Sequence, residues 1–184
     1  MKRVFIAIKV DLSDLFRHVF HLLKNDLAKE KIRWVVEENL HLTLRFLGDV
    51  DSTQIEKVIQ ALDEYCETRN RFSFQLEKLA YFKKQRKPAV IFIDTSIRDK
   101  LVEFAHGLDQ NLVDIGFPPN PKFTPHLTLG RIKYLKDPEA FYDLLTSMQK
   151  TTVQQVDVGQ IVFYESILKP EGPIYQVIRK FDLK

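Results

Sequence analysis

The tetrapeptide His-Leu-Thr-Leu occurs twice in this chain, at His41–Leu44 and at His126–Leu129, and the copies are 85 residues apart. Sliding the sequence by the same distance also aligns two buried-strand patterns, Phe5–Ile8 and Val90–Ile93. A match that extends beyond the tetrapeptide indicates that a supersecondary unit has been duplicated. The duplication constrains the fold, because an approximate twofold axis brings equivalent residues of the two copies together.

Each copy is predicted to run strand, helix, HLTL strand, helix, strand. Apolar residues at helical spacing predict four helices, which begin near Leu12, Ser52, Ile97 and Asp137. Asp11 and Ser96 are good N-cap residues and are predicted to cap the first helix of each copy. Alternating stretches rich in β-formers predict further strands over residues 72–81, 153–168 and 174–181.

The HLTL strands carry the chemistry that the chain offers. Side chains alternate along a strand, so the His and Thr of each copy share one face while the leucines face the core. If the two faces meet, the site has two acid/base groups and two hydrogen-bond donors, which suits the cleavage of a phosphodiester. These four residues are His41, Thr43, His126 and Thr128.

Composition excludes several classes of protein. At 184 residues with 45% apolar content, the chain fits one domain or two small lobes. No apolar run approaches a membrane span, the N-terminus does not resemble a secretory signal, and Cys66 is the single cysteine, so a cytoplasmic protein is expected. No zinc-ligand pattern and no glycine-rich phosphate loop is present, so neither a metal nor a cofactor is expected.

The net charge of +3 is too small for a global polyanion-binding field, but four basic residues cluster at Lys83, Lys84, Arg86 and Lys87. Such a run is usually a solvated loop. The alternative is a loop that touches the phosphates of a nucleic acid.

The residues around the two motifs resemble a known family. The chain strongly resembles the two-histidine (2H) phosphoesterases, and among them the RNA 2′,3′-cyclic phosphodiesterases, also called 2′-5′ RNA ligases. Nearly the whole chain is covered by the resemblance. The segments that carry it are Arg3–Ile8, Trp34–Leu40, Arg45–Gly48, Phe123–Pro125, Gly130–Arg131, Phe163–Ser166 and Gly172–Tyr175, together with the two HxTx motifs.

The resemblance implies an α+β fold in which two lobes, related by a pseudo-twofold axis, contribute two antiparallel sheets that face a central cleft, with helices outside. Residues 1–184 are then expected to form a single domain of two interleaved lobes. The repeat units span approximately 3–82 and 88–168, and residues 174–181 form a C-terminal strand.

The resemblance also implies an activity. Family members open the 2′,3′-cyclic phosphate at an RNA end to a 2′-phosphomonoester, and some also join RNA ends through a 2′-5′ linkage. By resemblance His41 is the general acid and His126 the general base, whereas the residues alone leave this choice open because the motifs are nearly equivalent. Thr43 and Thr128 would donate hydrogen bonds to the phosphate. We expect a metal-independent monomer that acts on RNA ends or related nucleotides.

Four further residues are candidates for substrate binding. Arg131 lies at an odd offset from His126, so it reaches the same face only if the strand bulges near Gly130. Arg45 is a similar candidate, and Phe5 and Trp34 are aromatic residues that either stack on a base or belong to the core.

Two alternative functions remain open at this point. One is a phosphodiesterase that acts on small cyclic nucleotides or on 2′-5′ oligonucleotides. The other is a ribonucleotide-binding module without turnover.

Overall fold

The computed structural model describes residues 1–120, 122–148, 152–170 and 172–184, and it contains two antiparallel sheets. Sheet A has the strand order β3 (His41–Val50), β1 (Lys2–Lys9), β8 (Gln160–Lys169) and β9 (Gly172–Asp182). Sheet B has the order β2 (Lys31–Trp34), β6 (Leu127–Tyr134), β5 (Lys87–Thr95), β4 (Phe72–Lys84) and β7 (Thr152–Val158). The expected α+β fold with two antiparallel sheets is confirmed.

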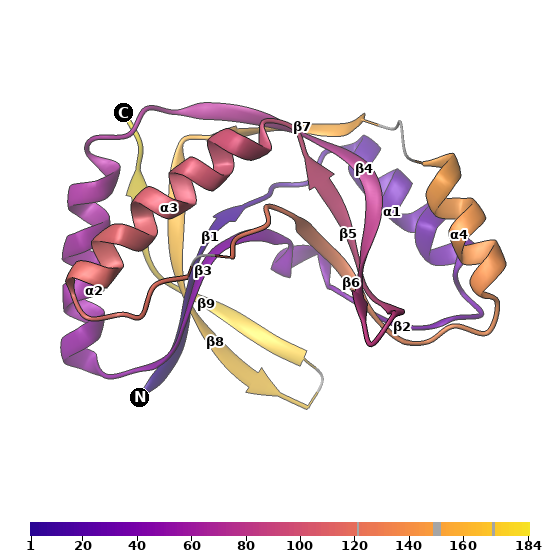
Figure 1. Cartoon of the computed structure of the whole chain (residues 1–184), viewed down its shortest axis with the longest axis horizontal. Coiled ribbons are helices and arrows are strands. Elements are labelled where there is room, and N and C mark those ends of the chain that lie inside the picture. Colours follow the sequence, from indigo (N-terminus) through magenta and orange to yellow (C-terminus); the bar gives the residue numbers. More distant parts are fainter. Residues whose placement is uncertain (121, 149–151, 171) are drawn as a thin grey trace.

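The helices lie on the outside of the two sheets (Figure 1). They are α1 (Asp14–Asp26), α2 (Ser52–Cys66), α3 (Arg98–Asp114) and α4 (Pro138–Ser147), and a short 3-10 helix spans Glu37–Asn39. The helices α2 and α3 pack together beside sheet A, whereas α1 and α4 lie beside sheet B. In the described part of the chain, no helix has both the length and the apolar character needed to cross a membrane.

The two copies exchange elements. Sheet A contains the order β3-β1-β8, and sheet B contains the equivalent order β6-β5-β4, so β8 pairs with β1 as β4 pairs with β5. The helix α1 follows a strand of sheet A yet packs near β7 of sheet B, and α3 follows a strand of sheet B yet contacts β3 of sheet A. Each sheet is therefore covered partly by the helix of the other copy.

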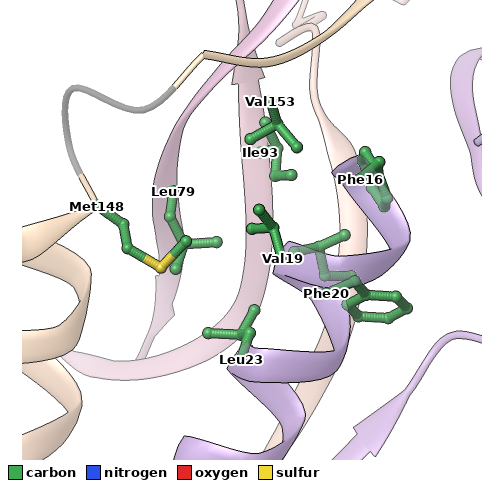
Figure 2. Close-up of a pocket in the computed structure, with 9 residues that line it drawn as sticks. Phe16, Val19, Phe20, Leu23, Leu79, Ile93, Met148 and Val153 are labelled. Carbon is green, nitrogen blue, oxygen red and sulfur yellow. The ribbon is translucent and has the colours of Figure 1, made fainter. Parts of the chain in front are cut away.

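The apolar face of α1 fills the space behind sheet B, as Figure 2 shows. Phe16, Phe20 and Leu23 are each no more than 1% exposed, and burial of such side chains contributes about 1.5–3 kcal/mol each. The cavity that remains among these side chains measures only about 10 Å³, which is barely the volume that one water molecule needs. This interior holds the sheet in place and offers no room for a ligand.

Three details differ from the sequence-based expectations. Ser13, not Asp11, caps α1, since its hydroxyl accepts a hydrogen bond from the Phe16 amide. Ser96 does not cap α3, because its hydroxyl accepts a hydrogen bond from the Gln75 amide on β4 instead. The stretch 153–168 is divided after β7, at Gly159, because β7 pairs in sheet B and β8 in sheet A.

Candidate active site

The two HLTL histidines hold the same tautomer. The Nδ1 atom of His41 lies 2.7 Å from the carbonyl oxygen of Asn39, and Nδ1 of His126 lies 2.7 Å from that of Thr124. A carbonyl only accepts, so each Nδ1 carries a proton and donates it. The Nε2 atom of each ring is therefore the one that can exchange a proton with a substrate.

The alternation predicted for the HLTL strands is confirmed. Leu42 and Leu127 are fully buried, while the threonines beside them are only half-buried. The threonines lie on the face of the sheet that carries the histidine, and this face is called the inner face of each sheet from here on. The Thr43 hydroxyl lies 2.9 Å from Nε2 of His41. An imidazole nitrogen and a hydroxyl thus reach the same point above sheet A.

Aromatic rings form the floor under both histidines. The ring of His41 lies 4.9 Å from that of Phe5 and 5.1 Å from that of Tyr175. The ring of His126 lies 4.8 Å from Phe82 and 5.5 Å from Phe92, both edge to face. These apolar surroundings exclude water from one side of each imidazole.

Burial disfavours the charged form of both imidazoles. It lowers the pKa of His41 to about 4, against the opposing effect of the Asn39 carbonyl, and the nearby His126 lowers this pKa further. The pKa of His126 is also lowered, first by burial, while the Thr124 carbonyl opposes the shift and Arg131 reinforces it. The strands β3 and β6 contact each other across the two sheets, and the electrostatic effect of His126 on His41 agrees with this arrangement.

A β-bulge lies at the last residue of each motif. Leu44 is an extra residue in the pairing of β3 with β1, and Leu129 is the equivalent extra residue in the pairing of β6 with β5. A bulge reverses the alternation beyond it. The second residue after each bulge, Phe46 or Arg131, therefore returns to the inner face.

Arg131 is placed near the histidines by this bulge. Its charge lowers the pKa of His126 on its own sheet and also that of Tyr175 on sheet A. Phe46, its equivalent, is 59% exposed and its ring lies 5.4 Å from that of Phe5. An arginine thus stands beside one histidine and a phenylalanine near the other.

Arg45 and Trp34 are directed away from the histidines. The Arg45 Nε lies 3.0 Å from a carboxylate oxygen of Asp109 on α3, and its guanidinium also donates to the carbonyl of Pro118. Trp34 is half-buried against the main core and lies edge-on to Phe20 of α1, with ring centroids 5.8 Å apart. Phe5, by contrast, is buried directly beneath His41.

Several residues at the site were not nominated from the sequence. They are Phe46, Tyr164, Tyr175, Phe82, Phe92 and Asn39. The 85-residue offset aligns Phe46 with Arg131, which was a usable signal. Tyr164 lies in β8 and Tyr175 in β9, both far along the chain from His41, and no local pattern connects them to this histidine.

Asn39 occupies a special position among these residues. Its backbone carbonyl accepts the proton of His41 Nδ1, and its side-chain amide donates to the carbonyl of Pro173 on β9 at 2.8 Å. Asn39 therefore ties the segment that orients His41 to the strand that carries Tyr175. Within the described residues, no group of three or more His, Cys, Asp or Glu side chains is placed to hold a metal ion.

Comparisons with known proteins place this geometry in a family. The model of the family described as "LigT like Phosphoesterase" matches the chain twice, over residues 7–92 and 91–175. An RNA 2′,3′-cyclic phosphodiesterase of Thermotoga maritima is 33% identical over 177 residues, which cover 96% of this chain and 92% of the relative. A protein of the same name from Archaeoglobus fulgidus is 31% identical over 180 residues, covering 98% and 99%.

The crystal structure of E. coli LigT complexed with 3′-AMP shares the fold. It superimposes with a TM-score of 0.78 at 21% identity, covering 100% of this chain and 98% of that one. The two family matches fall on the two sequence repeats, and together they take in both histidine motifs. The chain belongs to the LigT-like phosphoesterase family.

Proposed function

We propose that this protein hydrolyses the 2′,3′-cyclic phosphodiester at RNA ends to a 2′-phosphomonoester, without a metal ion. The observation that carries the proposal is the pair of imidazoles on neighbouring inner faces, each with Nδ1 bound to a carbonyl and Nε2 turned to the other side of the ring. The relatives named RNA 2′,3′-cyclic phosphodiesterase support the choice of substrate.

In the proposed reaction, Nε2 of His126 removes a proton from water, and the resulting hydroxide attacks phosphorus. The bond from phosphorus to the ribose 3′-oxygen breaks, and Nε2 of His41 donates its proton to that oxygen. General acid and general base catalysis each contribute about 10²–10⁴-fold to such a step. With the 5′-hydroxyl of another RNA end in place of water as the nucleophile, the same groups would break the same bond to the 3′-oxygen and leave a 2′-5′ linkage.

The reaction requires one neutral and one protonated imidazole. Burial lowers the pKa of both, so both are neutral in the free protein at pH 7. A phosphodiester carries one negative charge, and this charge favours an imidazolium beside it. We therefore propose that His41 becomes protonated only when the substrate is bound, because the phosphate and the imidazolium then stabilise each other.

The phosphate itself is assigned three contacts. The hydroxyls of Thr43 and Thr128 share the inner faces with the histidines and would donate hydrogen bonds to the non-bridging oxygens. Arg131 supplies a positive charge on the His126 side, and a charged hydrogen bond of this kind contributes about 1.5–3 kcal/mol.

We also propose that residues 1–184 act as one domain of two interleaved lobes, with repeat units at approximately 3–82 and 88–168. The exchange of α1 and α3 between the sheets supports this, because neither sheet is covered by its own copy alone. Both histidines come from the same chain, so we propose a monomer, which size-exclusion chromatography with light scattering would test. RNA as the substrate favours a cytoplasmic enzyme.

The decisive experiment is to incubate the protein with an RNA that ends in a 2′,3′-cyclic phosphate, in excess EDTA, and to identify the product. A 2′-phosphate is expected. A 3′-phosphate would overturn the assignment of the leaving oxygen, and activity that appears only with added metal would overturn metal independence. Tight binding without product would instead favour a ribonucleotide-binding module.

A further inference from the structure

The β4–β5 hairpin carries the basic cluster of the sequence. Its two-residue turn is formed by Gln85 and Arg86, with φ of 49° and 66°, the positive values that suit a tight hairpin turn. Lys84 and Lys87 flank this turn and are cross-strand partners. Residues that pair directly across two strands project from the same face of the sheet.

The neighbouring side chains of β4 show which face this is. Tyr81 packs on Phe141 of α4, on the outer side of sheet B, and the Lys83 ammonium lies 5.8 Å over the Tyr81 ring. Phe82 contacts His126 and so points inward. The register shift beside Phe82 has its extra residue, Ala89, on β5, so the alternation along β4 is unbroken; Lys84 lies on the inner face with Phe82, and Lys83 does not.

The inner face of sheet B carries further positively charged side chains on its neighbouring strands. Val90 pairs with both Phe82 and Arg131, and Arg131 pairs with Arg33 of β2, so these residues form one row. Arg33 is directed towards sheet A, since a Cβ atom on Gly172 of β9 would lie 3.2 Å from its guanidinium.

Lys84 and Lys87 stand one row beyond the row that holds Arg131. Two residues of strand separate Lys84 from Phe82, which corresponds to about 7 Å. The acidic pair of these strands, Glu77 and Asp94, lies at the opposite end of β4 and β5. The positive charge is thus concentrated at the hairpin end of the inner face.

We propose that Lys84 and Lys87 form a subsite for the phosphodiester that precedes the terminal nucleotide of an RNA substrate. This proposal rests on the proposed function, because a 2′,3′-cyclic phosphate marks the 3′ end and the rest of the RNA must extend from the 5′ side of that nucleotide. Two ammonium groups bind phosphate as point charges and do not read a base. The substrate class is therefore an oligonucleotide rather than a cyclic mononucleotide, with no base preference at this step.

Two adjacent lysines give a matched test. Lys84→Ala and Lys83→Ala remove the same charge from the same hairpin, but only Lys84 faces inward. The Michaelis constant is measured for a 2′,3′-cyclic mononucleotide and for a trinucleotide with the same end, over a range of salt concentrations. Lys84→Ala is expected to raise the trinucleotide value about fivefold and to reduce its logarithmic salt slope by about 0.7, the contribution of one phosphate contact in a single strand. The mononucleotide value should stay constant, and Lys83→Ala should change neither.

Equal effects of the two variants would overturn the proposal in favour of a diffuse field, and an effect of Lys84→Ala on both substrates would move this residue into the catalytic centre. Binding of a trinucleotide with a 2′-phosphate end, followed by fluorescence anisotropy, provides a readout that needs no turnover. If the unmodified protein turns over neither substrate, the proposed function fails, and the anisotropy comparison of Lys84→Ala with Lys83→Ala still decides the subsite.

Discussion

The two HLTL regions are alike up to the bulge and differ immediately after it. Both histidines donate Nδ1–H to the carbonyl two residues earlier, and both strands bulge at the second leucine. The inner face then receives Phe46 in the first copy and Arg131 in the second. Duplication thus supplied two equivalent proton-transfer groups, and one pair of positions makes their electrostatic surroundings unequal.

The residue directly after the bulge also differs between the two copies. Arg45 extends outward to Asp109 of α3, whereas its equivalent is Gly130. A Cβ on Gly130 would lie only 2.9 Å from the side chains of Ile32 and Trp34 on β2. The glycine therefore permits β2 to pair with β6, while the arginine joins β3 to a helix of the other copy.

The unequal electrostatic surroundings of the two histidines indicate which acts as the base and which as the acid. Beside His126, the charge of Arg131 favours the neutral ring that a base needs. His41 is surrounded by Phe5, Tyr164 and Tyr175. The negative charge of a phosphate is therefore offset less by positive side chains beside His41 than beside His126. The substrate should therefore raise the pKa of His41 more than that of His126. Four predictions test this comparison.

Removal of either imidazole should have the largest effect. His41→Ala and His126→Ala are each expected to lower kcat by about 10²–10⁴-fold. The residual activities should differ in pH dependence, since His126→Ala loses the acidic limb of the bell-shaped profile and His41→Ala the alkaline limb. Thermal unfolding establishes that each variant is folded. Full activity in a folded variant would refute the role of that histidine.

Acid should destabilise the protein through His41. The pKa of this residue is about 4 in the folded state and about 6.5 in an unfolded chain. Between these values the unfolded state binds more protons, so stability falls as the pH drops from about 6.5 to 4, by about 3 kcal/mol in total. Urea unfolding of the protein and of His41→Gln at pH 7 and pH 4 measures this, and parallel pH dependence in the two proteins would contradict it.

The arginine of the second copy should affect both rate and pH profile. Arg131→Gln is expected to lower kcat/KM about 10–100-fold, because it removes a charged hydrogen bond of about 1.5–3 kcal/mol. Loss of the positive charge should also raise the pKa of His126, which moves the acidic limb of the profile to higher pH. Phe46→Leu, at the equivalent position, should leave that limb in place. An identical shift in both variants would remove the basis for the comparison.

The smallest effect is expected at Asn39, a positioning residue for His41. Asn39→Ala removes the hydrogen bond to Pro173, which contributes about 1 kcal/mol, and should lower kcat about fivefold. The hydrogen bond from Nδ1 to the Asn39 carbonyl raises the pKa of His41. A weaker bond should therefore lower this pKa and move the alkaline limb to lower pH. Thr124→Val, at the equivalent position before His126, is the control and should move neither limb.

Much of this arrangement could be predicted from the sequence, because both the repeat and the alternation of apolar and polar residues are visible in the order of the amino acids. The strand that begins at His41 and the strand that begins directly after His126 followed from these patterns, whereas the α+β class was implied by the resemblance to the family. A bulge near Gly130 was expected only as the condition for Arg131 to reach the histidine face, and the equivalent bulge at Leu44 was not predicted, since a leucine at a bulge resembles any other strand leucine. The division at Gly159 and the short strand β2 depend on which sheet edge is available for pairing, and that is decided by tertiary packing.

The exchange of α1 and α3 between the sheets bears on the origin of the fold. A single ancestral unit would have had only one helix, the counterpart of α2 and α4, beside its own sheet, so it could have covered that sheet fully only by exchanging the counterpart of α1 and α3 with a second molecule. The histidine pair would then have been shared by a swapped homodimer, and a later fusion of the two genes would have made this arrangement permanent. Fragments 1–85 and 86–184 should accordingly stay unfolded when separate and recover native circular dichroism when mixed. Failure to reconstitute would argue against this origin.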